Sequence, residues 1–393
     1  MSLLKREDSF FLLYLLCLLI FSSQKCKIAS PTYPRLCAFR PKMCFKWSQK
    51  PFLCVTNVFA TVFLHCEKLN VFFMRIIGTG SQLPKKLVTN DQLAHFIDTS
   101  DEWIRERTGI EQRHVMTNET LEDLAIAAAK NAMDDAGVLP TQLDYIICSN
   151  MVNEYVVPSM ASIVGGHIGS QCPAYDLNAA CTGFLYALDM ADVLLKAGRA
   201  EYILIISAEE PSRIVDWNDR STCVLFGDGA AAVVVTKGNS LRSIKVSSKS
   251  DKSVLYYRRP LEPTPFIIRD KNTGPLCMNG KEVFKSAVSS SLRDMQYVLD
   301  KAEITKDDVT YYVLHQANLR IIDFIRSHFE AKQEQIPINV NKYGNTSSAS
   351  IPLLLDELNR DGKLRKGDIL VLSAFGAGFT SAACVIEWNK SAN

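Results

Sequence analysis

The stretch Ala136-Gly-Val-Leu-Pro-Thr-Gln-Leu143-Asp-Tyr-Ile-Ile147 has a weak second copy 166 residues later, Ala302-Glu-Ile-Thr-Lys-Asp-Asp-Val309-Thr-Tyr-Tyr-Val313. Each copy has the pattern of a helix end, a polar turn and a buried strand. At the same offset, Tyr202-Ile-Leu-Ile-Ile-Ser207 matches Asp368-Ile-Leu-Val-Leu-Ser373. Two matches at one offset predict that the chain contains two related halves.

Helices and strands alternate in both halves. Apolar periodicity predicts helices at Leu121–Ala136, Thr182–Ala197 and Lys285–Ala302, between short apolar strands. Such alternation indicates an α/β fold with parallel sheet and helical layers. A further match, Phe226–Gly229 with Phe375–Gly378 at an offset of 149, makes the second copy the shorter one.

The first 73 residues differ in composition from the rest. They hold 10 of the 19 Phe and 6 of the 12 Cys but none of the 19 Gly. They also carry 10 Lys+Arg against 3 Asp+Glu, which leaves a net charge of −5 for residues 74–393. The apolar run Phe10–Phe21, behind Lys5 and Arg6, is too short to span a bilayer and resembles a signal-peptide core.

Two interpretations of this extension remain open, a targeting segment or a translation start at Met74, and the composition favours the second. We therefore expect an atypical extension over residues 1–73, a first half over 74–245 and a second half over 246–393. We expect a cytoplasmic protein if Met74 is the start, and an organelle or secretory route if the extension is a real targeting segment.

The cysteines of residues 74–393 show no CxxC and no Cys/His pairing at zinc-ligand spacing. We expect neither a disulfide framework nor a metal site, and scattered thiols fit a reducing compartment.

Cys181 is the first candidate for chemistry. Tyr175–Phe184 has the pattern of a strand, a tight turn of small residues and a helix start, which would place Cys181 at a helix N-terminus. Free N–H groups and the helix dipole there favour a thiolate. From this segment alone, a small buried apolar cysteine is equally plausible.

His315 and Asn345 are candidates from the second half. His315 directly follows the apolar strand Tyr311–Leu314, and the carboxyl ends of parallel strands face ligand crevices. Helix capping or core packing is the alternative for His315, and turn chemistry before a helix is the simplest explanation for Asn345. Because Cys181 belongs to the first half and His315 and Asn345 to the second, the crevice is expected where the two halves meet. At the offset of 166, Cys181 falls opposite Ser347.

The motifs Asn178-Ala-Ala-Cys181, His315-Gln-Ala-Asn318-Leu-Arg320 and Gly344-Asn345-Thr346-Ser347 occur in this order. On them the chain resembles β-ketoacyl-acyl-carrier-protein synthase III. The resemblance covers nearly all of residues 74–393 and none of 1–73. It extends through the segments Ile77–Gly80, Thr99–Ile110, Phe226–Gly229, Glu282–Lys285 and Ala374–Phe379.

The resemblance implies a thiolase fold, with two duplicated halves in five layers (α-β-α-β-α), and an acyltransferase that starts fatty acid synthesis. Cys181 would take an acyl group from acyl-CoA through a thiolate. His315 and Asn345 would stabilise the enolate of malonyl-acyl carrier protein as carbon dioxide leaves. Backbone N–H groups of Cys181 and Ala377 would form the oxyanion hole. Many relatives have glycine at the position of Ala377, and alanine should be tolerated there, because only its N–H is used, unless the residue needs a positive φ.

The resemblance also assigns binding residues and partners. A carrier-protein docking patch at Lys285, Arg320 and Arg326 is a hypothesis, since the carrier protein is acidic. A homodimer is implied, with no cofactor, no nucleic acid and no stable membrane association. The CoA-binding positions are Trp103, Arg107, Thr108, Arg220, Phe284, Asn318 and Phe375.

A related condensing enzyme of specialised, polyketide-like metabolism is the alternative within the fold, and a catalytically dead binding protein or a cysteine hydrolase fits the three motifs less well. The family match is poor over residues 237–280, which we expect to be a surface insertion. Val157 stands where a bulkier aromatic often stands, so we expect acceptance of primers beyond acetyl-CoA.

Overall fold

Two β-sheets lie face to face in the computed structural model, which describes residues 73–260, 264–266 and 274–390. The expectations for residues 1–72 lie outside the described residues. The first sheet has the order β1-β7-β6-β4-β5, in which β6, β4 and β5 run parallel and β7 is antiparallel to both neighbours. Its strands are β1 (Phe73–Gln82), β4 (Tyr145–Ser149), β5 (Ala174–Leu177), β6 (Tyr202–Glu209) and β7 (Gly229–Gly238).

The second sheet repeats four strands of this arrangement, in the order β11-β12-β13-β8. Only β11 and β12 are parallel, and β13 is antiparallel to β12 and β8. Its strands are β8 (Leu241–Asp251), β11 (Tyr311–Leu314), β12 (Ile369–Gly376) and β13 (Gly378–Glu387).

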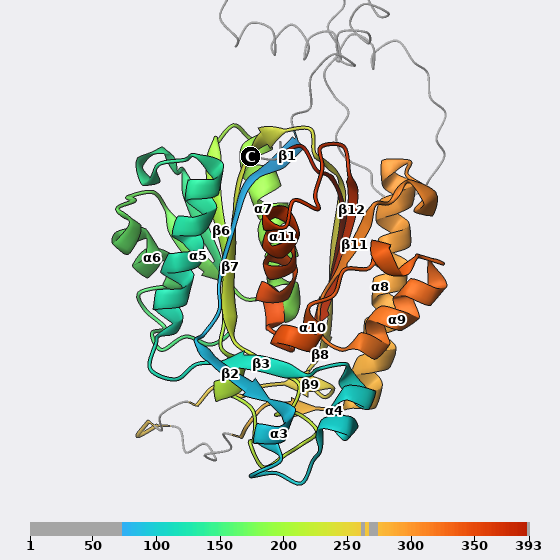
Figure 1. The fold of residues 1–393 in the computed structure, drawn as a ribbon. Helices are drawn as coiled ribbons and strands as arrows, with labels where there is room; N and C mark the ends of the chain where they lie inside the picture. The colour runs from blue at the N-terminus through green and yellow to red at the C-terminus, as the bar shows by residue number, and fades with distance from the viewer. Residues whose placement is uncertain (1–72, 261–263, 267–273, 391–393) are drawn as a thin grey trace, which may run out of the picture. The chain divides into compact units, whose positions relative to one another are not determined.

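Helices form three layers around these sheets, as Figure 1 shows. One pair covers the outer face of the first sheet, a second pair lies between the sheets, and a third covers the outer face of the second sheet, which gives the five layers expected. In that order the pairs are α5 (Leu121–Ala136) with α6 (Met160–Ile168), α7 (Gly183–Lys196) with α11 (Ser350–Arg360), and α8 (Gly280–Ala302) with α9 (Leu319–His328).

Local sequence explains where these helices begin and how they pack. Thr120 caps α5 in a capping box with Asp123, and Gly137 ends it at φ 64°. The central helix α7 buries apolar side chains such as Phe184 and Leu185 between the two sheets. A helix enclosed on both sides needs apolar residues over most of its surface, so α7 carries few charges.

A smaller group of elements lies at one end of the sheets (Figure 1). It comprises β2 (Lys86–Thr89) paired with β3 (Gln112–Val115), β9 (Leu255–Tyr256) paired with β10 (Cys277–Met278), α3 (Asn90–Leu93) and α4 (Asp101–Thr108). The remaining short helices are α10 (Val340–Tyr343), η1 (Pro140–Gln142), η2 (Ala180–Thr182), η3 (Pro211–Arg213), η4 (Lys306–Asp308), η5 (Gln333–Gln335) and η6 (Ser347–Ala349).

The backbone corrects the register of the repeat at the site by one residue. Ala180 opens η2 at φ 48° and Ser347 opens η6 at φ 52°. The N–H of Ala180 donates to Asn178 Oδ1, and the N–H of Ser347 donates to Asn345 Oδ1 in the same way. Ala180 is therefore the counterpart of Ser347, and Cys181 corresponds to Ser348, not to Ser347 as the sequence offset indicated.

Strand β8 corrects two further expectations. It pairs with β13 in the second sheet, so the division between the sheets falls between β7 and β8, and the expected boundary at residue 245 lies inside β8. Residues 241–251, expected to belong to a surface insertion, form this strand. In the part of the chain that the structure describes, no helix is long and apolar enough to cross a membrane.

Candidate functional site

Cys181 lies in η2, between the end of β5 and the start of α7, as the sequence predicts. Its Sγ is 3.4 Å from Ser347 Oγ, a side chain of the second half. Backbone from the second sheet also approaches, because a Cβ added to Gly376 would lie 2.8 Å from Cys181 N. Glycine at 376 therefore permits the close approach of β12 to the backbone amide of Cys181.

The pKa of the half-buried Cys181 thiol is raised, whereas the sequence predicted a lowered pKa and a thiolate. Burial raises the pKa of Cys181 to about 12, the hydrogen bond from Ser347 lowers it, and the nearby Glu209 raises it further. The loss of hydration thus outweighs the favourable position at the helix start. The resting residue is a neutral thiol that must lose a proton before it attacks.

His315 follows directly after β11, and its backbone N–H donates to the backbone carbonyl of Ser373 at 2.8 Å. The ring is 3% exposed, and burial lowers the pKa of His315 to about 3, so the imidazole is neutral near pH 7. Its Nδ1 is 2.7 Å from Ser350 Oγ, which also accepts the N–H of Gln316 at 3.4 Å. In the tautomer that has its hydrogen on Nε2, the Ser350 hydroxyl donates to Nδ1, and the Nε2–H is free to donate to a ligand.

Asn345 is held on both its backbone and its side chain. Its N–H donates to Leu225 O at 2.8 Å and its carbonyl accepts Gly227 N–H at 3.2 Å. Its Oδ1 accepts Ser347 N–H at 2.9 Å, and the side chain is 7% exposed. Because the amide oxygen is used, its NH₂ group is the donor left for a ligand.

The loop from Asn345 to Ser350 links the three predicted residues. Ser347 contacts Cys181, Ser350 contacts His315, and Asn345 lies in the same turn. Cys181 thus comes from the first half and His315 and Asn345 from the second, and this loop lies where the two halves meet.

Trp103 on α4 lies against two guanidinium groups. The carbon of the Arg107 guanidinium is 4.6 Å from the indole centroid and that of Arg220 is 4.9 Å away. Arg220 is anchored by Asp98, whose carbonyl accepts from it at 2.6 Å. The structure thus brings together three of the predicted CoA-binding residues, of which Arg220 lies more than 100 positions from the other two in the chain.

Thr108 and Asn318 make structural contacts beside this cluster. Thr108 is 3% exposed, and its hydroxyl donates to Ile104 O and accepts Ile110 N–H. Thr108 is thus the buried last residue of α4, and both of its hydroxyl contacts are to backbone groups. Asn318 caps α9 and donates to Arg107 O at 3.1 Å, so it fastens α4 to α9.

Comparisons with known proteins agree with this arrangement. Residues 175–252 match the family described as 3-oxoacyl-[acyl-carrier-protein (ACP)] synthase III, and residues 299–388 match its C-terminal part. A β-ketoacyl-[acyl-carrier-protein] synthase III of Helicobacter pylori is 39% identical over 324 residues, 80% of this chain and 98% of that protein. One of Aquifex aeolicus is 41% identical over 315 residues, 80% of this chain and 99% of that protein.

The chain belongs to the β-ketoacyl-[acyl-carrier-protein] synthase III family. The crystal structure of the 3-oxoacyl-[acyl-carrier-protein] synthase III from Aquifex aeolicus matches with a TM-score of 0.76 and 40% identity, over 80% of this chain and all of that one. The fold is therefore the thiolase fold, and the protein is an acyltransferase. The priming β-ketosynthase of the R1128 polyketide pathway has a TM-score of 0.76 at 32% identity, over 81% of this chain and 97% of that one.

In this synthase, the two phenylalanines among the predicted CoA-binding positions lie in different surroundings. The Phe375 ring is 5.3 Å from the His315 ring and is 5% exposed, so it packs against the imidazole. Phe284 on α8 packs edge-on against Phe324 of α9, and Phe324 is 48% exposed.

The predicted docking residues occupy the same side of the synthase as Phe324. Lys285 follows Phe284 on α8, and Arg320 lies on the first turn of α9, where its Nε donates to Glu106 O at 3.2 Å. Both are exposed. Arg326 is half-buried and paired with Asp323 at 3.3 Å, so less of its charge is available to a partner.

A cavity of about 870 Å³ adjoins the nucleophile loop of the synthase. The divergent segment forms one wall of it, which the sequence did not predict. Its lining includes Asn178, Ala180 and Ala377 from the site and Tyr256, Tyr257 and Arg259 from that segment.

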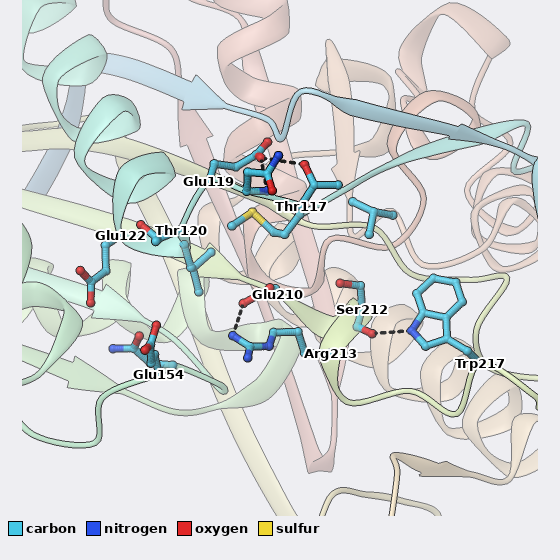
Figure 2. A pocket seen from close by; sticks show the side chains of 14 residues that line it. Thr117, Glu119, Thr120, Glu122, Glu154, Glu210, Ser212, Arg213 and Trp217 are labelled. Atoms are coloured by element: carbon cyan, nitrogen blue, oxygen red, sulfur yellow. Dashed lines mark hydrogen bonds and ion pairs between the residues drawn. The ribbon is translucent and has the colours of Figure 1, made fainter.

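A second hollow, of about 720 Å³, lies at the end of β6 and contains none of the predicted site residues (Figure 2). In it Glu210 points toward Arg213, and the indole of Trp217 donates to Ser212 O. Over the described ranges, no group of three His, Cys, Asp or Glu side chains is placed to hold a metal ion.

Sequence reasoning missed Ser350 and Glu209. Ser350 closes the small-residue run that begins at Gly344, so its place after the Asn345 motif was a usable signal. Glu209 is the last residue of β6 and is followed by Glu210, and only the fold shows that Glu209 is buried against the site while Glu210 faces the second hollow.

Proposed function

We propose that Cys181, His315 and Asn345 carry out the two half-reactions of this synthase. An acyl group from acyl-CoA is joined to malonyl-acyl carrier protein, with loss of carbon dioxide, to give 3-oxoacyl-acyl carrier protein, the first condensation of fatty acid synthesis. The observation that carries the assignment is the loop from Asn345 to Ser350, which contacts both Cys181 and His315.

In the first half-reaction, the Cys181 sulfur attacks the thioester carbonyl of acyl-CoA, and CoA leaves. The oxyanion is stabilised by the backbone N–H groups of Cys181 and Ala377. The approach of Gly376 to Cys181 N supports this pair, since it brings the turn at Ala377 close to the nucleophile. Among the described residues with positive φ is Gly378, at 137°, and not Ala377, so alanine is unstrained there.

In the second half-reaction, His315 and Asn345 donate hydrogen bonds to the thioester oxygen of malonyl-acyl carrier protein. A neutral imidazole with its hydrogen on Nε2 and an amide with its NH₂ free are both donors. Charge on that oxygen grows as carbon dioxide leaves, so both bonds strengthen in the transition state. The carbanion then attacks the acyl group on Cys181.

The adenine end of CoA binds at the cluster of Trp103, Arg107 and Arg220, where aromatic and guanidinium faces favour stacking with a base. The pantetheine path runs along Phe284, Phe375 and Asn318, since Asn318 contacts Arg107 of this cluster and Phe375 contacts His315 of the site. Acyl carrier protein docks on the exposed cations Lys285 and Arg320 beside Phe324, with Arg326 contributing less.

Fatty acid synthesis is favoured over specialised metabolism. The relatives at 39% and 41% identity carry the name β-ketoacyl-[acyl-carrier-protein] synthase III, whereas the polyketide priming enzyme is 32% identical.

The synthase acts as a homodimer in the cytoplasm. The exposed apolar run Tyr155, Val156 and Val157, 49–81% exposed, supports a covered interface, and the six free cysteines of the described residues fit a reducing compartment.

The two half-reactions can be separated by substitution. Cys181→Ala should abolish acyl-enzyme formation but retain release of labelled carbon dioxide from malonyl-acyl carrier protein. His315→Ala and Asn345→Ala should retain acylation and lose about 10²–10³-fold in carbon dioxide release, as expected for removal of one oxyanion donor. Unchanged release in both second-half variants would refute the assignment.

A further inference from the structure

A buried carboxylate lies on the far side of Ser347 from the nucleophile. Glu209, at the end of β6, is 1% exposed. Its Oε1 accepts from Ser348 Oγ at 2.6 Å and from Ser347 Oγ at 3.3 Å, and its Oε2 accepts Met151 N–H at 3.3 Å. Glu209 thus faces the same loop that carries Asn345.

Ser347 connects this carboxylate to the thiol. Its Oγ lies 3.4 Å from Cys181 Sγ and 3.3 Å from Glu209 Oε1. A hydroxyl has one hydrogen and two lone pairs. When the hydrogen is donated to Glu209, the Ser347 oxygen is left to accept the S–H of Cys181, which completes a line from thiol to hydroxyl to carboxylate.

We propose that Glu209 receives the proton of the Cys181 thiol through the Ser347 hydroxyl during acylation, and returns it to Cys181 after condensation. The proposal rests on the assignment of Cys181 as the acylated nucleophile. Glu209 acts through Ser347 and does not touch the substrate.

The proton and the charges balance over the cycle. In acylation, the S–H proton moves to Ser347 Oγ as the Ser347 proton moves to Glu209. The sulfur bonds to the acyl carbon, and the carbon–sulfur bond to CoA breaks. The CoA thiolate takes a proton from solvent. In condensation, the carbanion expels Cys181 as a thiolate, and Glu209 returns its proton through Ser347.

The environment gives each group a suitable affinity for the proton. Burial raises the pKa of Glu209 to about 7, while the hydrogen bond from Ser348 is the largest effect that lowers it. The carboxylate is therefore a base with a proton affinity matched to neutral pH, whereas the half-buried Cys181 thiol, whose pKa is raised, needs a base.

The groups that face Glu209 add no competing charge. Its titratable neighbours are the thiols of Cys181 and Cys148, both neutral because burial raises their pKa values. Over the described residues, no lysine, arginine or histidine forms an ion pair with Glu209. The adjacent Glu210 points the other way and lies 3.6 Å from Arg213.

A purely structural role, in which Glu209 fastens the two halves through Ser347 and Ser348, makes different predictions. Glu209→Gln keeps an oxygen that accepts from both serines but cannot take a proton. Glu210→Gln is the matched control, because that carboxylate is also buried, with its pKa raised to about 7, and has no contact with the nucleophile loop.

The test measures single-turnover acylation of the full chain with acetyl-CoA by quenched intact-mass analysis between pH 5.5 and 9. In the unmodified protein and in Glu210→Gln, the rate should rise through about pH 7 as Glu209 loses its proton. In Glu209→Gln, the acylation rate at pH 7.5 should fall roughly 10²-fold or more. The rising limb of the pH–rate profile near pH 7 should vanish in this variant. An unchanged rate and limb would overturn the relay.

Two serine variants keep the proposal testable if Glu209→Gln does not fold. Ser347→Ala removes the link and should abolish the limb. Ser348→Ala removes the bond that lowers the pKa of Glu209, so the limb should persist and move to higher pH. Equal profiles for these two variants would contradict the relay. Absence of any acyl adduct on the unmodified protein would contradict the proposed function instead.

Discussion

Gly109 lies between α4, which carries the CoA-binding cluster, and α9. Its replacement by alanine should lower the free energy of unfolding for two separable reasons, a strained backbone conformation and a steric clash. Gly109 ends α4 at φ 76°, where an added Cβ would lie 2.5 Å from Leu319 Cβ. The left-handed conformation costs alanine about 1–2 kcal/mol, and the clash adds about 1–3 kcal/mol as overpacking. We therefore expect Gly109→Ala to lower the free energy of unfolding by about 2–5 kcal/mol.

Gly137 supplies the matched control. It ends α5 at φ 64°, and an added Cβ would meet nothing within 4 Å. Gly137→Ala should therefore show the conformational cost alone, about 1–2 kcal/mol. Urea unfolding at constant m-value measures both, and the difference of about 1–3 kcal/mol reports the Leu319 clash.

The same pair of variants tests the role of α4 in binding. Relief of the clash moves α4, which carries Trp103 and Arg107, away from α9. The KM for acyl-CoA should then rise about tenfold, equivalent to roughly 1.4 kcal/mol, in Gly109→Ala and stay unchanged in Gly137→Ala. Equal loss of stability and equal KM values in the two variants would refute this reasoning.

Four further predictions follow from the described contacts. Trp103→Ala should raise the KM for acyl-CoA about tenfold with little change in kcat, as loss of a stacking contact of roughly 1–2 kcal/mol requires. Carbon dioxide release should be independent of pH between about 5.5 and 8 in the half-reaction assay, because the pKa of His315 is lowered to about 3 and the donor stays neutral. Below the ordinary histidine pKa of about 6.5, unfolding takes up a proton at His315, so the free energy of unfolding should fall as pH drops from there toward 3. Arg320→Glu should raise the KM for malonyl-acyl carrier protein severalfold, whereas Lys366→Glu, on the loop before β12, should not.

The sequence contained enough to predict the fold because the duplication repeats local patterns. Apolar strands such as Ile203–Ile206 and Leu370–Leu372 are buried runs in both copies. Helix α5 has the predicted bounds, while α8 begins at Gly280, before the predicted Lys285, because Asn279 caps it. Caps of this kind depend on backbone geometry that apolar periodicity does not describe.

The sequence supplied candidate residues for the site but not their electrostatics. The motif order placed Cys181, His315 and Asn345 together, yet the protonation state of Cys181 depends on burial by residues from both halves. The contact between Cys181 and Ser347 joins residues 166 positions apart. The contact between Ser347 and Glu209 depends on where strand β6 ends. Such desolvation is a property of the packed structure and has no local sequence signal.

The most direct test of the central claim is the mass of the protein after incubation with acetyl-CoA, followed by peptide mapping and addition of malonyl-acyl carrier protein. We expect one acetyl adduct on the peptide that contains Cys181, absent in Cys181→Ala and discharged when 3-oxoacyl-acyl carrier protein forms. An adduct that persists in Cys181→Ala, or one that malonyl-acyl carrier protein does not discharge, would contradict the account.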